Sequence, residues 1–91
     1  MFIVVSYDIE SNRTRTRLAK RLKDFGPRVQ KSVFEADIDD GEYKRLCELL
    51  GQVRLGDADS IRLYRLCAGC VAQTAIWGVG EVSTDKDYYI T

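Results

Sequence analysis

The spacing of apolar residues along this chain switches between strand-like and helix-like periods, and this alternation restricts the folds open to it. Residues 2–9 form a short run rich in β-branched and aromatic side chains, which predicts a strand buried on both faces. A helix is expected next, capped by Ser11 or Asn12 and ended by Gly26-Pro27. Its apolar positions recur at helical spacing, at Leu18, Leu22 and Phe25.

A change of phase marks the middle of the chain. Residues 28–38 are extended, but their apolar side chains move from one alternation phase to the other, which predicts a bulge or a tight reversal near Ser32. Asp39-Asp40 then supplies an N-cap and a favourable first turn for a second helix that ends at Gly51. The apolar face expected for that helix consists of Tyr43, Leu46, Cys47 and Leu50.

The last third adds short strands. Residues 60–66 are predicted to form a strand, residues 75–77 a shorter one before the break at Gly78-Val79-Gly80, and residues 87–91 an edge strand. The order predicts an α/β sandwich, one sheet covered by two helices, within a single domain spanning 1–91. We expect the ferredoxin-like βαββαβ arrangement, with its hairpin in residues 28–38 and a short extra C-terminal strand. Residues 85–91 would form a tail that pairs across a dimer or with a partner.

Composition limits the chemistry. The 91 residues include no histidine, which excludes Ser-His and Cys-His nucleophile pairs, a histidine general base and any zinc site that needs imidazole. Carboxylate, thiol, tyrosine or metal chemistry remains. A chain this short buries a modest share of its surface, so self-association would add stability and a homodimer is favoured.

The cysteines and apolar runs indicate a compartment. No apolar run approaches the roughly 18 residues of a membrane span, and three cysteines do not suit a secreted disulfide framework, so we expect a cytoplasmic protein. Cys67 and Cys70 form a lone C-x-x-C, which is half a zinc site unless a dimer shares it. A thioredoxin-type role needs the pair after an early strand and at the start of a helix, which the predicted order does not provide. We interpret the pair as a structural turn and Cys47 as a core residue.

The 14 basic and 14 acidic residues are unevenly distributed. Residues 10–31 contain eight basic and two acidic side chains, whereas residues 35–59 contain eight acidic and three basic ones. The first of these stretches therefore suits a polyanion. A solvated basic helix face that keeps the protein soluble explains the same pattern.

Asp8 ends the first strand, where polar residues commonly form the mouth of a site. It is either a cap of the following turn or a magnesium ligand, and since one carboxylate holds Mg²⁺ poorly, a two-fold axis would supply the second. Arg15, Arg17 and Arg28 are expected near the strand end, where guanidinium groups bind phosphate oxygens and a metal-held water would be the nucleophile. Tyr7 and Phe34 either stack on bases or belong to the core.

Three stretches of the chain together resemble the CRISPR-associated protein two family of prokaryotes. They are Val5-Ser6-Tyr7-Asp8-Ile9 with Arg15 and Arg17 after it, Arg28-Val29-Gln30-Lys31-Ser32-Val33-Phe34-Glu35, and Ser60-Ile61-Arg62-Leu63-Tyr64-Arg65-Leu66-Cys67.

The resemblance implies a ferredoxin-like homodimer with Mg²⁺ held between two copies of Asp8. It implies a metal-dependent endonuclease acting on single-stranded RNA or double-stranded DNA, and a partner of the CRISPR integrase in spacer acquisition. The positions that it assigns are Tyr7 and Asp8 at the strand end, Arg15, Arg17 and Arg28 as phosphate contacts, and Phe34 beside the site. Arg13 adds an arginine in alternate register, which leaves open which arginines reach the phosphate.

Two functions of different class follow. The first is a magnesium-dependent phosphodiesterase with Asp8 as its metal ligand. The second is a non-catalytic architectural dimer that bridges integrase subunits and binds duplex DNA. A small-molecule-sensing ferredoxin-like module fits less well, because the chain contains no Gly-rich phosphate loop.

Overall fold

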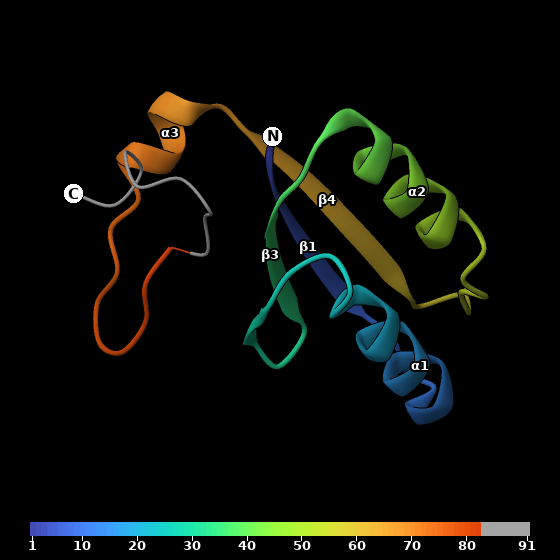
Figure 1. Cartoon of the computed structure of the whole chain (residues 1–91). Helices are drawn as coiled ribbons and strands as arrows, with labels where there is room; N and C mark the ends of the chain where they lie inside the picture. Colours follow the sequence, from blue (N-terminus) through green and yellow to red (C-terminus); the bar gives the residue numbers. More distant parts are fainter. Residues whose placement is uncertain (83–91) are drawn as a thin grey trace.

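The computed structural model describes residues 1–82 and contains one four-stranded sheet covered by helices (Figure 1). Residues 85–91, and with them the expected edge strand, lie outside the described residues. The elements in chain order are β1 (Phe2–Asp8), α1 (Asn12–Leu22), β2 (Arg28–Gln30), β3 (Val33–Asp37), α2 (Asp40–Gly51), β4 (Ser60–Leu66) and α3 (Ala68–Ala72).

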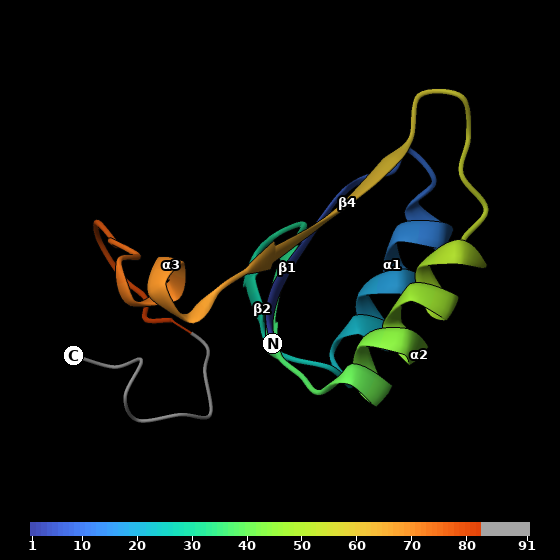
Figure 2. The ribbon, with the colours of Figure 1, turned by 90° about the horizontal axis from the view of Figure 1, so that it is seen from above.

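The sheet is antiparallel in the order β2-β3-β1-β4, so β1 is central and pairs with both β3 and β4. Figure 2 shows α1 and α2 side by side on the same face of this sheet. This is the ferredoxin-like βαββαβ arrangement that the sequence predicts, followed by the short helix α3, which the sequence did not predict.

The core lies between the sheet and these two helices. Ile3, Val5 and Tyr7 of β1 are buried in it, whereas Val4 and Ser6 are partly exposed. The prediction that β1 is buried on both faces is therefore wrong, because α1 and α2 cover only one side of the sheet. The other face of β1 stays open near its C-terminal end.

Helix α1 begins as predicted, with the Ser11 hydroxyl accepting a hydrogen bond from the Thr14 N–H. It ends at Leu22, four residues before Gly26, because the chain turns there to bring Gly26 against β3. A Cβ at Gly26 would collide with the Glu35 carbonyl oxygen and with Ala36. The close approach of two backbones thus requires glycine at this position.

The reversal expected near Ser32 is confirmed. Strands β2 and β3 form a hairpin through residues 31–32, with a register irregularity between Arg28 and Gln30. The Ser32 carbonyl then accepts a hydrogen bond from the Tyr7 N–H at 3.1 Å. This bond extends the contact between the hairpin and the end of β1.

Helix α2 has the predicted Asp39 cap, completed by Glu42 as a capping box. Leu46 is fully buried against the sheet, but Cys47 is exposed. The assignment of Cys47 to the core is wrong, because α2 presents only a narrow apolar stripe to the sheet and Cys47 lies outside it.

After β4, which matches its prediction, residues 75–77 form no strand. Trp77 is 89 % exposed, and no described strand lies alongside to complete a ladder with this segment. The predicted break is present, with positive φ angles at Gly78 and Gly80. Within residues 1–82, no helix is long and apolar enough to cross a membrane.

Candidate functional site

Asp8 lies in a shallow hollow at the C-terminal end of β1. Pairing between β1 and β4 sets Asp8 opposite Ser60 and Ser6 opposite Arg62, so these side chains share the open face of the sheet. The carboxylate is exposed, and among the described residues no ion pair engages it. The hollow is lined by Ser6, Tyr7, Asp8, Ser60, Arg62 and Tyr64.

Sequence reasoning missed the β4 side of this hollow. Arg62 donates a hydrogen bond to the Tyr64 hydroxyl at 3.4 Å, and this acceptor raises the pKa of Arg62, so the cation beside Asp8 stays charged. The available signal was the alternation over residues 60–64, in which Ser60, Arg62 and Tyr64 are separated by the apolar Ile61 and Leu63.

Asp59 fixes the loops at this end of the sheet. Its carboxylate accepts hydrogen bonds from the Glu10 N–H at 2.9 Å and from the Gly56 N–H at 2.8 Å. These bonds, that from Glu10 foremost, lower the pKa of Asp59. The loop after β1 and the loop before β4 are thereby tied together next to Asp8.

The donors around Asp8 are compatible with a hard cation. Carboxylate and hydroxyl oxygens are the ligands that Mg²⁺ prefers, and Asp8 with Ser60 and Ser6 offers that chemistry. However, the described residues contain no group of three or more carboxylates or thiols placed to hold a metal ion. One carboxylate is a weak anchor for Mg²⁺, and Asp8 of a second copy of the chain would strengthen the site.

A second, strongly basic hollow lies on the helix side of the sheet, between α1 and the β2–β3 hairpin. Below it, the Tyr7 and Phe34 rings stack with centroids 6.3 Å apart, and the Arg28 guanidinium lies 5.4 Å from the Phe34 ring centre. Both rings are buried, so they support Arg28 from beneath instead of facing solvent. The lining residues are Tyr7, Arg15, Thr16, Ala19, Lys20, Lys23, Arg28 and Lys31.

Arg15 lies beside the end of β1, as its position on the helix predicts, but its guanidinium is already engaged. It donates to the Ile9 carbonyl at 2.7 Å and to the Asn12 side-chain oxygen at 2.7 Å. Arg15 therefore holds the loop between β1 and α1, and contributes to the basic hollow from that fixed position.

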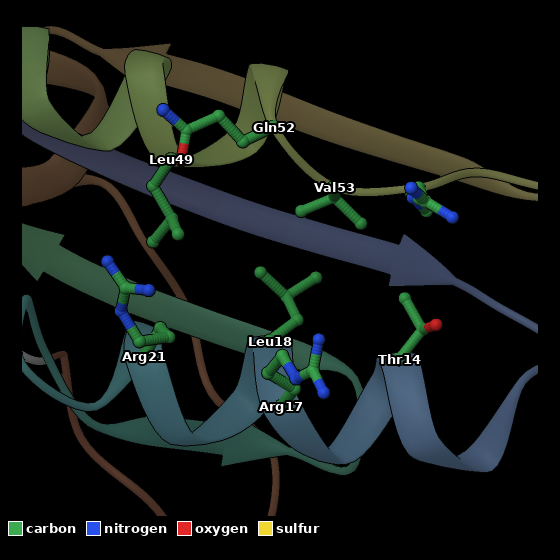
Figure 3. Close-up of a pocket in the computed structure, with 8 residues that line it drawn as sticks. Thr14, Arg17, Leu18, Arg21, Leu49, Gln52 and Val53 are labelled. Carbon is green, nitrogen blue, oxygen red and sulfur yellow. The ribbon is translucent and has the colours of Figure 1, made fainter.

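Arg17 is directed elsewhere. It lines a cavity between α1 and α2 whose apolar floor is formed by Leu18, Leu49 and Val53 (Figure 3). The expected grouping around the strand end is thus divided: Asp8 lies on the open face, Arg15 and Arg28 on the helix side, and Arg17 between the helices.

Tyr7 borders both of the first two hollows, which lie on opposite faces of the sheet. Its hydroxyl is buried with no hydrogen-bond partner in the described part of the chain. An unsatisfied buried hydroxyl of this kind costs free energy.

Fold and site define a small ferredoxin-like domain with an exposed carboxylate on the open face of its sheet and a basic hollow on the helix side. Residues 1–74 match the family model described as CRISPR associated protein Cas2. The CRISPR-associated endoribonuclease Cas2 3 of Chloroflexus aurantiacus is 43 % identical over 90 residues, 99 % of this chain and 97 % of that protein. This chain belongs to the Cas2 family.

Solved structures agree. The crystal structure of Streptococcus pyogenes Cas2 at pH 6.5 is similar with a TM-score of 0.73 and 30 % identity, over 86 % of this chain and 100 % of that one. A chain of a partial Cas6-RT-Cas1–Cas2 complex is similar with a TM-score of 0.66 and 28 % identity, over 82 % of this chain and 88 % of that one. The likeness covers the ferredoxin-like core described above.

Proposed function

We propose that this protein is a CRISPR-associated endoribonuclease that hydrolyses phosphodiester bonds with magnesium and takes part in CRISPR adaptation. The curated relatives are named endoribonucleases. The observation that carries the proposal is the isolated Asp8 carboxylate, which lies with Arg62 in a hollow on the open face of the sheet, while a basic hollow lies on the helix side.

The side chains of this chain divide the work by location. The basic hollow binds the phosphate backbone through Arg28 and its lysines, with Arg15 fixed beside the strand end. Asp8, with the hydroxyl of Ser60 nearby, would hold a magnesium ion, which supplies a water of lowered pKa and stabilises charge on the phosphate. Arg62 adds a permanent positive charge at the rim of the same hollow.

We propose further that the active form is a homodimer. One chain offers one carboxylate, which is a weak site for Mg²⁺, and a two-fold axis next to the open face would bring a second Asp8 to it. Ser6 and Asp8 lie on the face of β1 opposite to the buried Val5 and Tyr7. Figure 2 shows that α1 and α2 leave this face of the sheet uncovered, so it is accessible to a second copy.

Replacing Asp8 by asparagine tests the proposal. Asp8→Asn keeps the shape of the side chain and removes its charge, so cleavage of single-stranded RNA in magnesium should fall at least about 100-fold, because loss of a ligand costs more than loss of its outer-shell partner. Binding of the same RNA should persist, because the basic hollow is untouched. Cleavage is followed on a labelled RNA and binding by anisotropy in calcium or without metal.

Glu10→Gln is the matched control. Glu10 is an exposed carboxylate two residues away, and its contact with Asp59 uses the backbone N–H. The Glu10→Gln variant should cleave RNA at the parental rate. Cleavage by Asp8→Asn that equals the parental rate would place the catalytic site elsewhere or assign the activity to a contaminant.

A second function is favoured by one comparison. The likeness to a chain of a complex that contains Cas1 supports the proposal that this protein also assembles with a Cas1 integrase and binds DNA within that assembly. Co-purification of Asp8→Asn with a Cas1 protein would support assembly without catalysis. Loss of co-purification in Asp8→Asn would instead tie assembly to the metal site.

A further inference from the structure

The cysteine pair does not form the isolated turn expected from sequence. β4 ends at Leu66, Cys67 follows it as the N-cap of α3, and Cys70 lies within the first turn of that helix. The Val71 N–H donates to the Cys67 carbonyl at 3.0 Å, which fixes the backbone of the turn. The expectation that the pair does not open a helix is thus wrong, although the strand before it is the last of the sheet and not an early one.

The two thiols face each other and solvent. Side chains three apart in a helical turn are neighbours, and the Cys70 thiol donates a hydrogen bond to the Cys67 sulfur, so the two sulfurs are in contact. Both cysteines are exposed, so a small molecule reaches them. The Cys67 sulfur also lies over the turn, 3.9 Å from the position of a Cβ at Gly69.

The pair is chemically asymmetric. The backbone N–H and then the thiol of Cys70 donate to the Cys67 sulfur and lower the pKa of Cys67, while the same thiol contact raises the pKa of Cys70. Cys67 is therefore the more readily ionised sulfur, and Cys70 keeps its proton. A nucleophilic thiolate beside a protonated thiol is the arrangement used in thiol–disulfide exchange.

We propose that Cys67 and Cys70 form a reversible disulfide by exchange with a small disulfide such as glutathione disulfide. The Cys67 thiolate attacks one glutathione sulfur, forms a mixed disulfide and expels a glutathione thiolate. Cys70 then gives its proton to solvent, attacks the Cys67 sulfur and releases the second glutathione thiolate. Two cysteine thiols are oxidised, and one glutathione disulfide is reduced to two thiols.

This site is independent of the proposed nuclease. In the pairing of β1 with β4, Leu66 lies opposite Phe2, whereas Asp8 lies opposite Ser60, so the dithiol is at the other end of the sheet from the carboxylate. Figure 1 likewise shows α3 apart from α1 and α2. Disulfide formation would constrain the start of the segment that carries the exposed Trp77.

Cys47 provides an internal control. It is the one cysteine of the chain outside the pair. It is exposed on α2, and its thiol contacts Tyr43 instead of another thiol. Exchange at Cys47 therefore stops at a mixed disulfide, because no resolving thiol of the same chain is beside it.

The full-length protein is equilibrated with glutathione buffers of increasing oxidised fraction, quenched, alkylated and digested for mass spectrometry. We expect one peptide to lose two hydrogens through a Cys67–Cys70 bond, at a lower oxidised fraction than modifies Cys47. In Cys70→Ser, glutathione should accumulate on Cys67. In Cys67→Ser, Cys70 should react with glutathione disulfide at least about 10-fold more slowly than Cys67 does in Cys70→Ser, because a smaller fraction of Cys70 is thiolate.

Glutathione attached to all three cysteines at similar rates, with no Cys67–Cys70 bond, would overturn the proposal. The measurement on the unmodified chain decides this even if a serine variant fails to fold. RNA cleavage by the oxidised protein should match that of the reduced protein, which separates this test from that of Asp8.

Discussion

Arg15 and Arg17 lie two residues apart on α1, yet their guanidinium groups have different surroundings. Arg15 donates to the Ile9 carbonyl and to Asn12, whereas Arg17 lines the cavity between α1 and α2. The helical repeat predicts that residues at this spacing point in different directions, and it placed Arg15 beside the strand end. It could not predict that loop carbonyls occupy the Arg15 guanidinium, because that depends on the backbone path of residues 9–11.

These surroundings predict different effects on stability. Arg15→Ala removes charge-assisted hydrogen bonds that hold the loop after β1 and should lower the free energy of unfolding by about 1–3 kcal/mol. Arg17→Ala should change it by less than about 0.5 kcal/mol, as is usual for an exposed side chain without such bonds. Urea denaturation followed by circular dichroism measures both. Equal stability of the two variants would contradict the proposal that Arg15 holds the loop between β1 and α1.

At the scale of the elements, the sheet and the two long helices followed from sequence because their signals are local. The phase change near Ser32 predicted the hairpin, and Asp39 predicted the start of α2. Cys47 and residues 75–77 were misassigned because burial of a helix side and pairing of a strand depend on neighbours that are distant in sequence. The role of Asp59 was not predicted for the same reason, since its partner Glu10 is 49 residues away.

The bonds of Asp59 between two loops predict a pH dependence. Hydrogen bonds lower its pKa in the folded protein below the ordinary value of about 3.9. The resulting stabilisation is complete above that ordinary value and is lost as the pH falls through the folded-state pKa. The melting temperature of the parent should therefore fall more steeply as the pH drops below about 4 than that of Asp59→Asn, which lacks this titration.

Thermal melts across that pH range provide the check. Asp57 is an exposed carboxylate in the same loop, so Asp57→Asn is the control. Its melting temperature should fall with pH as steeply as that of the parent. Parallel pH profiles for the parent and Asp59→Asn would show that the two loops are not held by the Asp59 carboxylate.

At the scale of the whole molecule, two copies are expected from sequence, because the chain is short and has one carboxylate at the end of its first strand. The expected convergence of Asp8 with Arg15, Arg17 and Arg28 did not follow, because the sheet itself separates the open face from the helix side. A linear pattern reports which face of its own element a residue occupies. It does not report which side of a finished sheet that face becomes.

Mixed dimers test whether two Asp8 carboxylates share one site. When the parent and Asp8→Asn are refolded together in equal amounts, random pairing leaves about a quarter of the dimers with two parental chains. RNA cleavage per total protein should then fall to about one quarter of the parental value. A value near one half would mean that each chain cleaves with its own Asp8 alone.

Because α1 and α2 cover the same side of the sheet, the central strand carries two kinds of constraint in alternation. Val5 and Tyr7 are packed in the core, so the effect of a substitution there on stability depends on the volume and shape of the new side chain. Ser6 and Asp8 face away from the helices, and substitutions there alter chemistry with little effect on folding. The tolerance of folding to mutation along the end of β1 should therefore rise and fall with every second residue, and on the open side it is chemistry, at Asp8 above all, that limits substitution.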